Sequence, residues 1–171
     1  MMLFHPKVDY KKYNNDEELI ENMEGDKIYE VAPSFDKPYK QSELPLTQLQ
    51  PMTWFWLNTY NPKQINTFQQ EAKEYDWSST FIGESDALGF STNESFTSNV
   101  DLSYDYDEFL KLLKTSTCSE HKKAYQKMKD TKIDDVEILG VIVYGTKDEI
   151  ADIMKDPIIK SSSLGGVIEN Y

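Results

Sequence analysis

The sequence contains no arginine: its 18 basic residues are all lysine, and they face 30 acidic residues, so the formal net charge is -12. Without guanidinium groups the chain lacks the planar fork that binds phosphate or carboxylate through two hydrogen bonds. A net negative charge of this size also repels the phosphates of nucleic acids and of anionic membranes. We therefore expect no nucleic-acid partner.

Cysteine and long apolar stretches are also scarce. Cys118 is the single cysteine, so no intramolecular disulfide can form. No stretch approaches the roughly 20 apolar residues of a membrane-spanning helix, and Met1 to Pro6 lacks the apolar core of a signal peptide. These absences fit either a cytosolic protein or an extracellular domain whose anchor lies outside these residues.

The motifs of common enzymes and metal sites are missing as well. There is no serine-hydrolase elbow, no HExxH zinc motif and no GxGxxG fingerprint. Cys118 and His121 have the spacing of half a zinc site, but His5 is the only other histidine and zinc takes about four ligands. The acidic residues between Asp101 and Glu108 lack the glycine and terminal glutamate of a calcium loop. We expect no catalytic residue, metal site or cofactor, and a solvated acidic face.

The strongest secondary-structure signal lies near the C-terminus. Ile138–Tyr144 is uncharged and rich in β-branched residues, which predicts a strand buried on both faces in the middle of a sheet. Thr146–Glu149 has the spacing of a capping box at the start of a helix, and Asp156-Pro157 ends that helix. Ile158-Ile159 begins a second strand. Ser161–Gly166 is expected to form a flexible loop at the strand edge, and an anion cradle there is less favoured.

The first half of the chain shows the same order of elements. Ile28–Phe35 predicts a strand in which Pro33 indicates an edge position or a bulge. A turn at Asp36–Tyr39 follows, and then a short helix from Ser42 to about Gln50. Thr53–Thr59 predicts the closing strand. The two stretches together predict an α+β fold with a mixed sheet built from two βαβ-type units, with a ferredoxin-like tendency and inserted helices.

The remaining segments are expected to be inserted helices, a hairpin and loops. Asn61-Pro62 starts a helix that runs to about Glu74. Trp77–Phe90 indicates a hairpin or bent strand, and Ser91–Asp107 a surface loop. Two helices follow from Phe109 to about Lys129, separated near Thr115–Thr117. Residues 1–26 are expected to form a loose polar arm with one short helix, and residues 27–171 a single α+β domain.

Trp54 and Trp56 share one face of their strand, an arrangement that usually belongs to a core. An exposed tryptophan there would be a candidate anchor for a ligand or partner. The residues of the candidate ligand or partner surface come from several segments of the chain. It comprises Trp54, Trp56, Asp36, Tyr39, Ser162 and Ser163.

Five short motifs, taken in order and with their spacing, resemble one known family. They are Ser34–Tyr39, Trp54–Trp56, Gly140–Thr146, Asp156–Ile159 and Ser162–Gly165. The chain resembles the C-terminal domain of sigma factor regulators, the membrane-anchored anti-sigma proteins of Gram-positive bacteria. The resemblance covers about residues 28 to 169.

The resemblance implies a non-enzymatic sensor domain at the extracellular face of the bacterial plasma membrane. In that family a cytoplasmic segment holds an extracytoplasmic-function sigma factor inactive, and one transmembrane helix joins it to the outer domain. This chain would then reach a sigma factor only through a cytoplasmic segment that it does not contain, while its own partner would be an extracytoplasmic signal or protein.

Two further functions remain open. The chain could be a soluble small-molecule-binding regulatory module of ferredoxin-like type, with a pocket near Trp54 and Trp56. A carboxylate-dependent hydrolase is the least favoured of the three functions.

Overall fold

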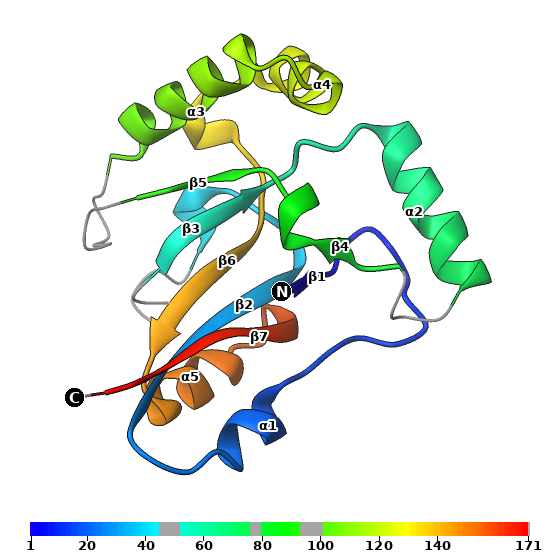
Figure 1. The fold of residues 1–171 in the computed structure, drawn as a ribbon. Helices are drawn as coiled ribbons and strands as arrows, with labels where there is room; N and C mark the ends of the chain where they lie inside the picture. The colour runs from blue at the N-terminus through cyan, green and yellow to red at the C-terminus, as the bar shows by residue number, and fades with distance from the viewer. Residues whose placement is uncertain (45–51, 76–79, 93–100, 171) are drawn as a thin grey trace.

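The computed structural model describes residues 1–44, 52–75, 80–92 and 101–170. Its centre is a five-stranded sheet with the strand order β5-β3-β6-β2-β7 (Figure 1). The middle strand, β6 (Ile138–Gly145), pairs with β3 on one side and with β2 on the other. All its residues except Tyr144 are buried. The prediction of a central strand covered on both faces is therefore confirmed.

Over Val141–Val143 the side chains of β6 alternate between two apolar clusters, as the two-residue period of a strand requires. Val141 and Val143 lie in the larger cluster, which fills one side of the sheet. Leu139 and Ile142 lie in the smaller cluster on the opposite side. Each face of the sheet therefore needs its own cover of helices or chain segments.

The order of the strands in the sheet differs from their order along the chain. β2 (Lys27–Tyr39) and β3 (Met52–Leu57) flank β6, and β7 (Ile159–Glu169) lies beyond β2. Numbered along the chain, these four strands have the ferredoxin-like order, in which another strand separates each parallel pair. The α+β class and the ferredoxin-like tendency are thus confirmed. The expectation of a mixed sheet is wrong, because every neighbouring pair that the described residues form is antiparallel.

β2 continues without interruption to Tyr39, so the turn expected at Asp36–Tyr39 is wrong. The edge position expected for Pro33 is also wrong, because β2 lies between β6 and β7. The alternative, a bulge, is present: the pairing of β2 becomes irregular directly after Ser34 on both sides. Pro33 itself stays in regular register opposite Ser162 of β7, so the irregularity lies just beyond the proline.

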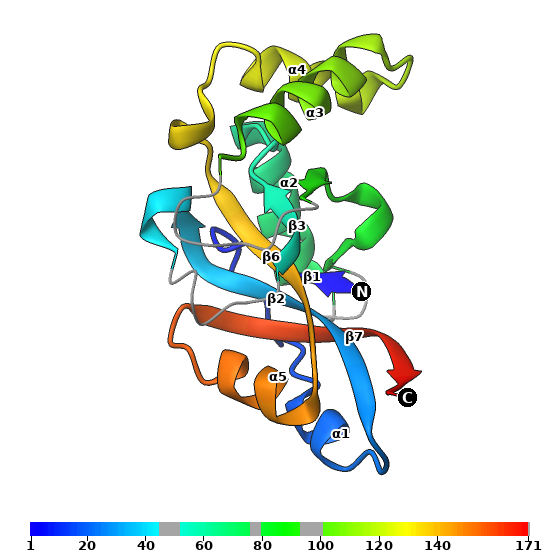
Figure 2. The same ribbon diagram turned by 90° about the vertical axis from the view of Figure 1, so that its left-hand side faces the viewer.

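Four helices supply residues to the larger cluster (Figure 2). They are α1 (Glu17–Glu21), α3 (Ser103–Thr115), α4 (Ser119–Met128) and α5 (Lys147–Met154). The break between α3 and α4 lies where the sequence predicts it. The loop expected over Ser91–Asp107 is wrong from Ser103 onward, where α3 begins, and residues 93–100 lie outside the described residues.

The helix starts follow the local sequence closely. Thr146 accepts a hydrogen bond from the Glu149 amide, and the Glu149 carboxylate accepts one from the Thr146 amide at 2.8 Å. Asn61 and Gln64 form the same reciprocal pair at the start of α2 (Pro62–Glu74). Such pairs satisfy the free amides of a first turn, so both predicted starts are confirmed.

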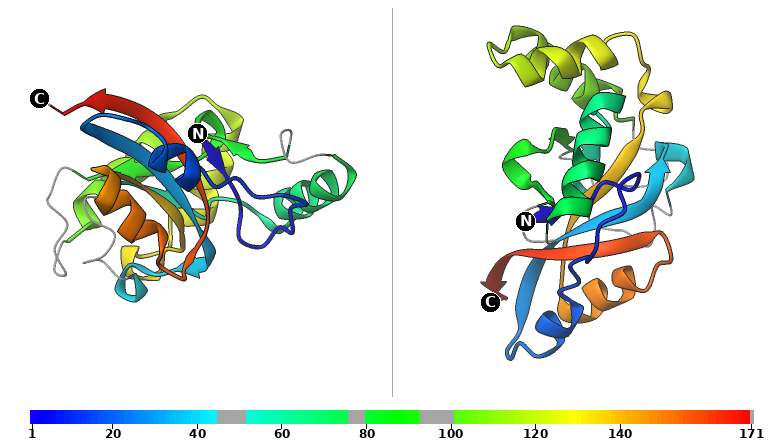
Figure 3. Two further views of the ribbon diagram at one scale, coloured as in Figure 1. Left: turned by 90° about the horizontal axis from the view of Figure 1, so that it is seen from below. Right: turned by 90° about the vertical axis from the view of Figure 1, so that its right-hand side faces the viewer.

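The opposite face of the sheet is covered by α2 and by the N-terminal segment, which we define as residues 1–16 (Figure 3). β1 (Met2–Leu3) of this segment pairs with β4 (Ile82–Gly83), whereas β5 (Gly89–Ser91) pairs with β3. The hairpin or bent strand expected over Trp77–Phe90 is therefore wrong for the described residues, since β4 and β5 belong to different sheets; residues 77–79 lie outside the described part of the chain. A short 3-10 helix, η3 (Glu84–Asp86), joins them.

Two further short 3-10 helices lie in the connections. η1 (Gln41–Glu43) follows β2, and η4 (Ile133–Asp135) precedes β6. The helix expected to continue to Gln50 falls on residues 45–51, which lie outside the described part of the chain. Among the described helices, none combines the length and apolarity needed to cross a bilayer.

Gly140 marks a place where β6 and β2 approach too closely for a side chain. A Cβ atom there would lie 2.5 Å from the carbonyl oxygen of Pro33. We expect Gly140→Ala to lower the free energy of unfolding in urea by about 2–3 kcal/mol, as overpacking of a core does. Gly166→Ala is the matched control, because its Cβ would meet only the Glu30 side chain, at 3.4 Å. Equal stability of the two variants would contradict the prediction.

Candidate functional site

The two tryptophans of β3 differ in exposure. Trp56 is fully buried, and its indole Nε1 donates to the Tyr60 hydroxyl at 3.3 Å. The ring of His5 meets it edge-on, with 6.3 Å between ring centroids. Trp54 lies on the same face of the strand and is half-buried. Of the two, only Trp54 is placed to touch a ligand or partner.

Trp54 lines an open depression of about 550 Å³ beside the sheet. Its indole packs directly on Gly89, where a Cβ would lie 2.6 Å from the ring. On the other side, the Tyr144 hydroxyl donates to Glu30, and this hydrogen bond together with burial raises the pKa of Tyr144 to about 12. The depression therefore offers aromatic surface, neutral polar groups and the carboxylate of Glu84. Its lining residues are Thr53, Trp54, Glu84, Ala87, Ser91, Thr92, Ile142 and Tyr144.

Asp36 and Tyr39 lie together near the end of β2. The Tyr39 hydroxyl donates to Asp36 Oδ1 at 2.8 Å. Burial, and then this hydrogen bond, raise the pKa of Tyr39 to about 12. The ring of Tyr39 belongs to the larger cluster, whereas Trp54 packs against the smaller one on the other side of the sheet. The structure therefore does not bring Asp36 and Tyr39 together with Trp54 in one surface.

Ser162 and Ser163 form a third group, and they bind the N-terminal segment. The Ser163 hydroxyl accepts from the Met2 amide at 2.9 Å. The Ser162 hydroxyl accepts from the Asp16 amide at 3.3 Å and donates to Asn15 at 2.9 Å. Both serines are buried within β7, so the expectation of a flexible loop over Ser161–Gly166 is wrong.

The expectation of a loose arm is also wrong for the start of the chain. Leu3, Phe4, Val8 and Tyr10 are buried, and Phe4 donates its amide to the Ser34 hydroxyl at 3.1 Å. This segment crosses the sheet to reach β7, as Figure 3 shows. The short helix expected in the arm is present as α1. The boundary at residue 26 stays a prediction.

His5 is the least expected buried residue of this segment. Its side chain is fully buried, and Nδ1 accepts from the Lys7 amide at 3.2 Å, which places the proton of the neutral ring on Nε2. Nε2 has no well-aligned hydrogen-bond partner in the described residues, although the Asn58 amide lies beside it. Burial lowers the pKa of His5 to about 4, and the positive charges of Lys7 and Lys127 act in the same direction.

Lys127 of α4 binds the residues that follow β3, near His5. Its ammonium donates to the carbonyl oxygens of Asn58 and Tyr60, each at 2.6 Å. Burial lowers the pKa of Lys127, against the attraction of Glu137. Asn58 in turn donates to the Glu137 carboxylate. The end of β3, α4 and the start of β6 are thereby tied together next to the N-terminal segment.

A second cavity lies between α2, η3 and α4 and has a volume of about 380 Å³. Cys118 and His121 line it, and no hydrogen bond joins these two described side chains. His121 Nδ1 lies 2.8 Å from the Ser116 hydroxyl, and Cys118 is exposed at the start of α4. The described residues hold no cluster of three or more possible metal ligands. We call this cavity the interhelical cleft.

The depression at Trp54 and the interhelical cleft are suited to binding a ligand or partner. The interhelical cleft is assembled from segments far apart in the sequence, so no local motif indicates it. The docking of the N-terminal segment had a weak signal, namely the apolar residues Leu3, Phe4, Val8 and Tyr10 among lysines and other polar residues. The sequence contained no signal for the burial of His5.

We expect Ser162→Ala to loosen the N-terminal segment while leaving the sheet intact. The change removes two hydrogen bonds and leaves the Asp16 amide without its acceptor, which costs about 1–3 kcal/mol. Amide hydrogen exchange of residues 1–16 should accelerate, whereas that of β6 should not. Ser119→Ala on the exposed start of α4 is the control. Unchanged exchange in residues 1–16 would show that the serine does not hold the segment.

Burial of His5 also predicts a dependence of stability on pH. Above pH 6.5 the ring is neutral in both states. As the pH falls from 6.5 toward 4, the unfolded chain binds a proton at His5 and the folded chain does not, so the free energy of unfolding falls, by about 3 kcal/mol over this range. His5→Gln should flatten the slope, measured by urea unfolding at each pH. His121→Gln, at the only other histidine, should follow the wild type, and equal slopes in both variants would refute the assignment.

Comparison with known proteins gives one result. No curated protein and no solved structure shows a significant match. The profile of the sigma factor regulator C-terminal family matches residues 20–166, which span β2, β3, β6, α5 and most of β7. A family of this description indicates a regulatory role toward sigma factors. Because the match covers most of the chain and agrees with the motif order in the sequence, the chain belongs to the sigma factor regulator C-terminal family.

Proposed function

We propose that the chain is the extracytoplasmic sensor and regulatory domain of a membrane-anchored anti-sigma factor of a Gram-positive bacterium. The observation that carries this proposal is the family match over residues 20–166. In such a protein a cytoplasmic segment holds the sigma factor, and a transmembrane helix connects that segment to the outer domain. This chain would contribute the outer domain, and both other parts would lie outside its 171 residues.

The described structure supports a binding role. The interhelical cleft and the depression at Trp54 offer surface for a ligand or partner. The acidic residues are mostly exposed, and several form surface ion pairs with lysines, such as Glu108 with Lys111 and Asp152 with Lys155. This solvated arrangement suits a domain that works outside a bilayer of anionic lipids.

The N-terminal segment is the part that would transmit a signal. It crosses the sheet between β7 and α2, and its contacts include the hydroxyls of Ser34, Ser162 and Ser163. If the anchor precedes residue 1, every force or movement between the membrane and the domain passes along this segment. A change in its docking would therefore couple the state of the domain to the cytoplasmic side.

A soluble small-molecule-binding module is the second candidate. The interhelical cleft favours it, because its volume falls in the range of roughly 300–1,000 Å³ that is usual for such sites. This alternative needs no anchor, and the location of the native protein separates the two functions.

Fractionation of native cells tests the proposal, with an antibody raised against this domain. We expect a membrane-bound band with an apparent mass well above the 19.9 kDa of the chain. The epitope should be accessible to antibody or protease from outside intact cells. A soluble band near 19.9 kDa would overturn the anchored regulator and leave the small-molecule-binding module.

A further inference from the structure

The interhelical cleft has three walls from separate parts of the chain. α2 supplies one wall, the stretch from Thr80 to Leu88 with η3 supplies the second, and α4 supplies the third. Thr59 and Tyr60, which follow β3, form the remaining side. The volume of about 380 Å³ accommodates a small organic molecule.

Aromatic rings line much of this cleft. Tyr60, Phe68 and Phe81 come from three different segments. Tyr60 and Phe68 meet edge-on, with 5.5 Å between ring centroids, and the two phenylalanines are partly exposed. The negative face of an aromatic ring attracts cations, and several such rings around one cavity form the usual site for ammonium groups.

The charges of the lining favour the same ligand class. Three carboxylates and one lysine line the cleft. Glu120 is already engaged, because one oxygen accepts from Lys123 at 2.6 Å and the other from Gln64 at 3.5 Å. Glu71 and Asp86 form no ion pair within the described residues. They lie on different walls, so a cation between them would meet both charges.

An anionic ligand does not suit this cavity. Lys123 is the one lysine among the described lining residues, and its ammonium is paired with Glu120. The net charge of -12 repels anions as they approach and attracts cations. The Tyr60 hydroxyl stays neutral, because burial raises its pKa.

We propose that the interhelical cleft binds a small organic cation, with its ammonium group between Glu71 and Asp86 and packed against the rings of Phe68 and Phe81. Primary polyamines and quaternary ammonium compounds share this chemistry. The binding claim stands on the cleft alone, whereas the role of the cation as the sensed signal rests on the proposed function.

The cleft also has a direct route to the N-terminal segment. Tyr60 lines the cleft and contacts the buried His5 ring edge-on, with 5.4 Å between centroids. Lys127 holds the Tyr60 carbonyl oxygen from α4, the same helix that forms a wall of the cleft. A ligand that draws α2 and α4 together would change the packing around His5, and hence the docking of residues 1–16.

Isothermal titration calorimetry of the full chain with spermidine and with choline tests the binding. Saturable one-to-one binding of at least one of them is expected. The double variant Glu71→Gln/Asp86→Asn should weaken that binding by at least about tenfold, which corresponds to the loss of about 1.4 kcal/mol. Magnesium chloride, a cation without carbon skeleton, should not compete at equal ionic strength.

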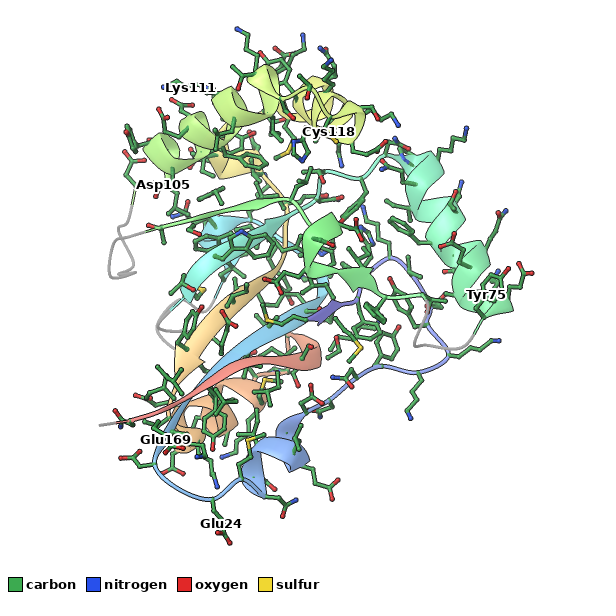
Figure 4. All side chains as sticks on the ribbon, viewed as in Figure 1. Glu24, Tyr75, Asp105, Lys111, Cys118 and Glu169 are labelled. Carbon is green, nitrogen blue, oxygen red and sulfur yellow. The ribbon has the colours of Figure 1, made fainter. Side chains whose placement is uncertain are left out.

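The matched control is the double variant Glu24→Gln/Asp107→Asn, which removes the same charge from two exposed carboxylates outside the cleft (Figure 4 labels Glu24). It should bind like the wild type. Equal weakening in both double variants would reveal general attraction to an acidic surface and would overturn the proposal, as would a lack of saturable binding. Because the titration uses the isolated chain, its outcome is independent of where fractionation places the native protein.

Discussion

The approach of β2 to β6 at Gly140 is the constraint on which the remaining structure depends. β6 is buried on both faces and both edges, so its neighbours must lie at full pairing distance along its length. The carbonyl oxygen of Pro33 occupies the space that a side chain at position 140 would need. The pairing of β2 becomes irregular directly after Ser34, the residue opposite Gly140. With this pair of strands in place, the larger apolar cluster is covered by α1, α3, α4 and α5. The smaller cluster, on the opposite face, is covered by α2 and the N-terminal segment.

Much of the fold could be predicted because its signals are local. The apolar run of β6 and the two capping boxes, at Asn61 and at Thr146, act over a few residues. The strand through Ser161–Ser163 could not be predicted in this way. Three serines in sequence indicate a loop, and in the folded chain the hydroxyls of Ser162 and Ser163 are paired with groups about 150 positions away along the chain. Long-range partners of this kind leave no trace in the local pattern.

The candidate sites were less predictable for the same reason. The sequence singled out Trp54 correctly as half of an aromatic stripe, yet only the packing of Trp56 against Tyr60 and His5 shows which of the two is enclosed. Asp36 and Tyr39 lie on the other side of the sheet from Trp54. The interhelical cleft draws on four separated segments, so its composition of rings and carboxylates emerges only in three dimensions.

The manner in which the N-terminal segment is held bears on the order of folding. The five-stranded sheet takes no strand from residues 1–16, since β1 belongs to a separate two-stranded sheet with β4. Serine hydroxyls provide several of the contacts between this segment and the five-stranded sheet. The main ladder is therefore complete without the segment, and the segment can dock after the sheet has formed. A chain built in this way can release its first residues and bind them again without breaking any backbone pairing in its central sheet.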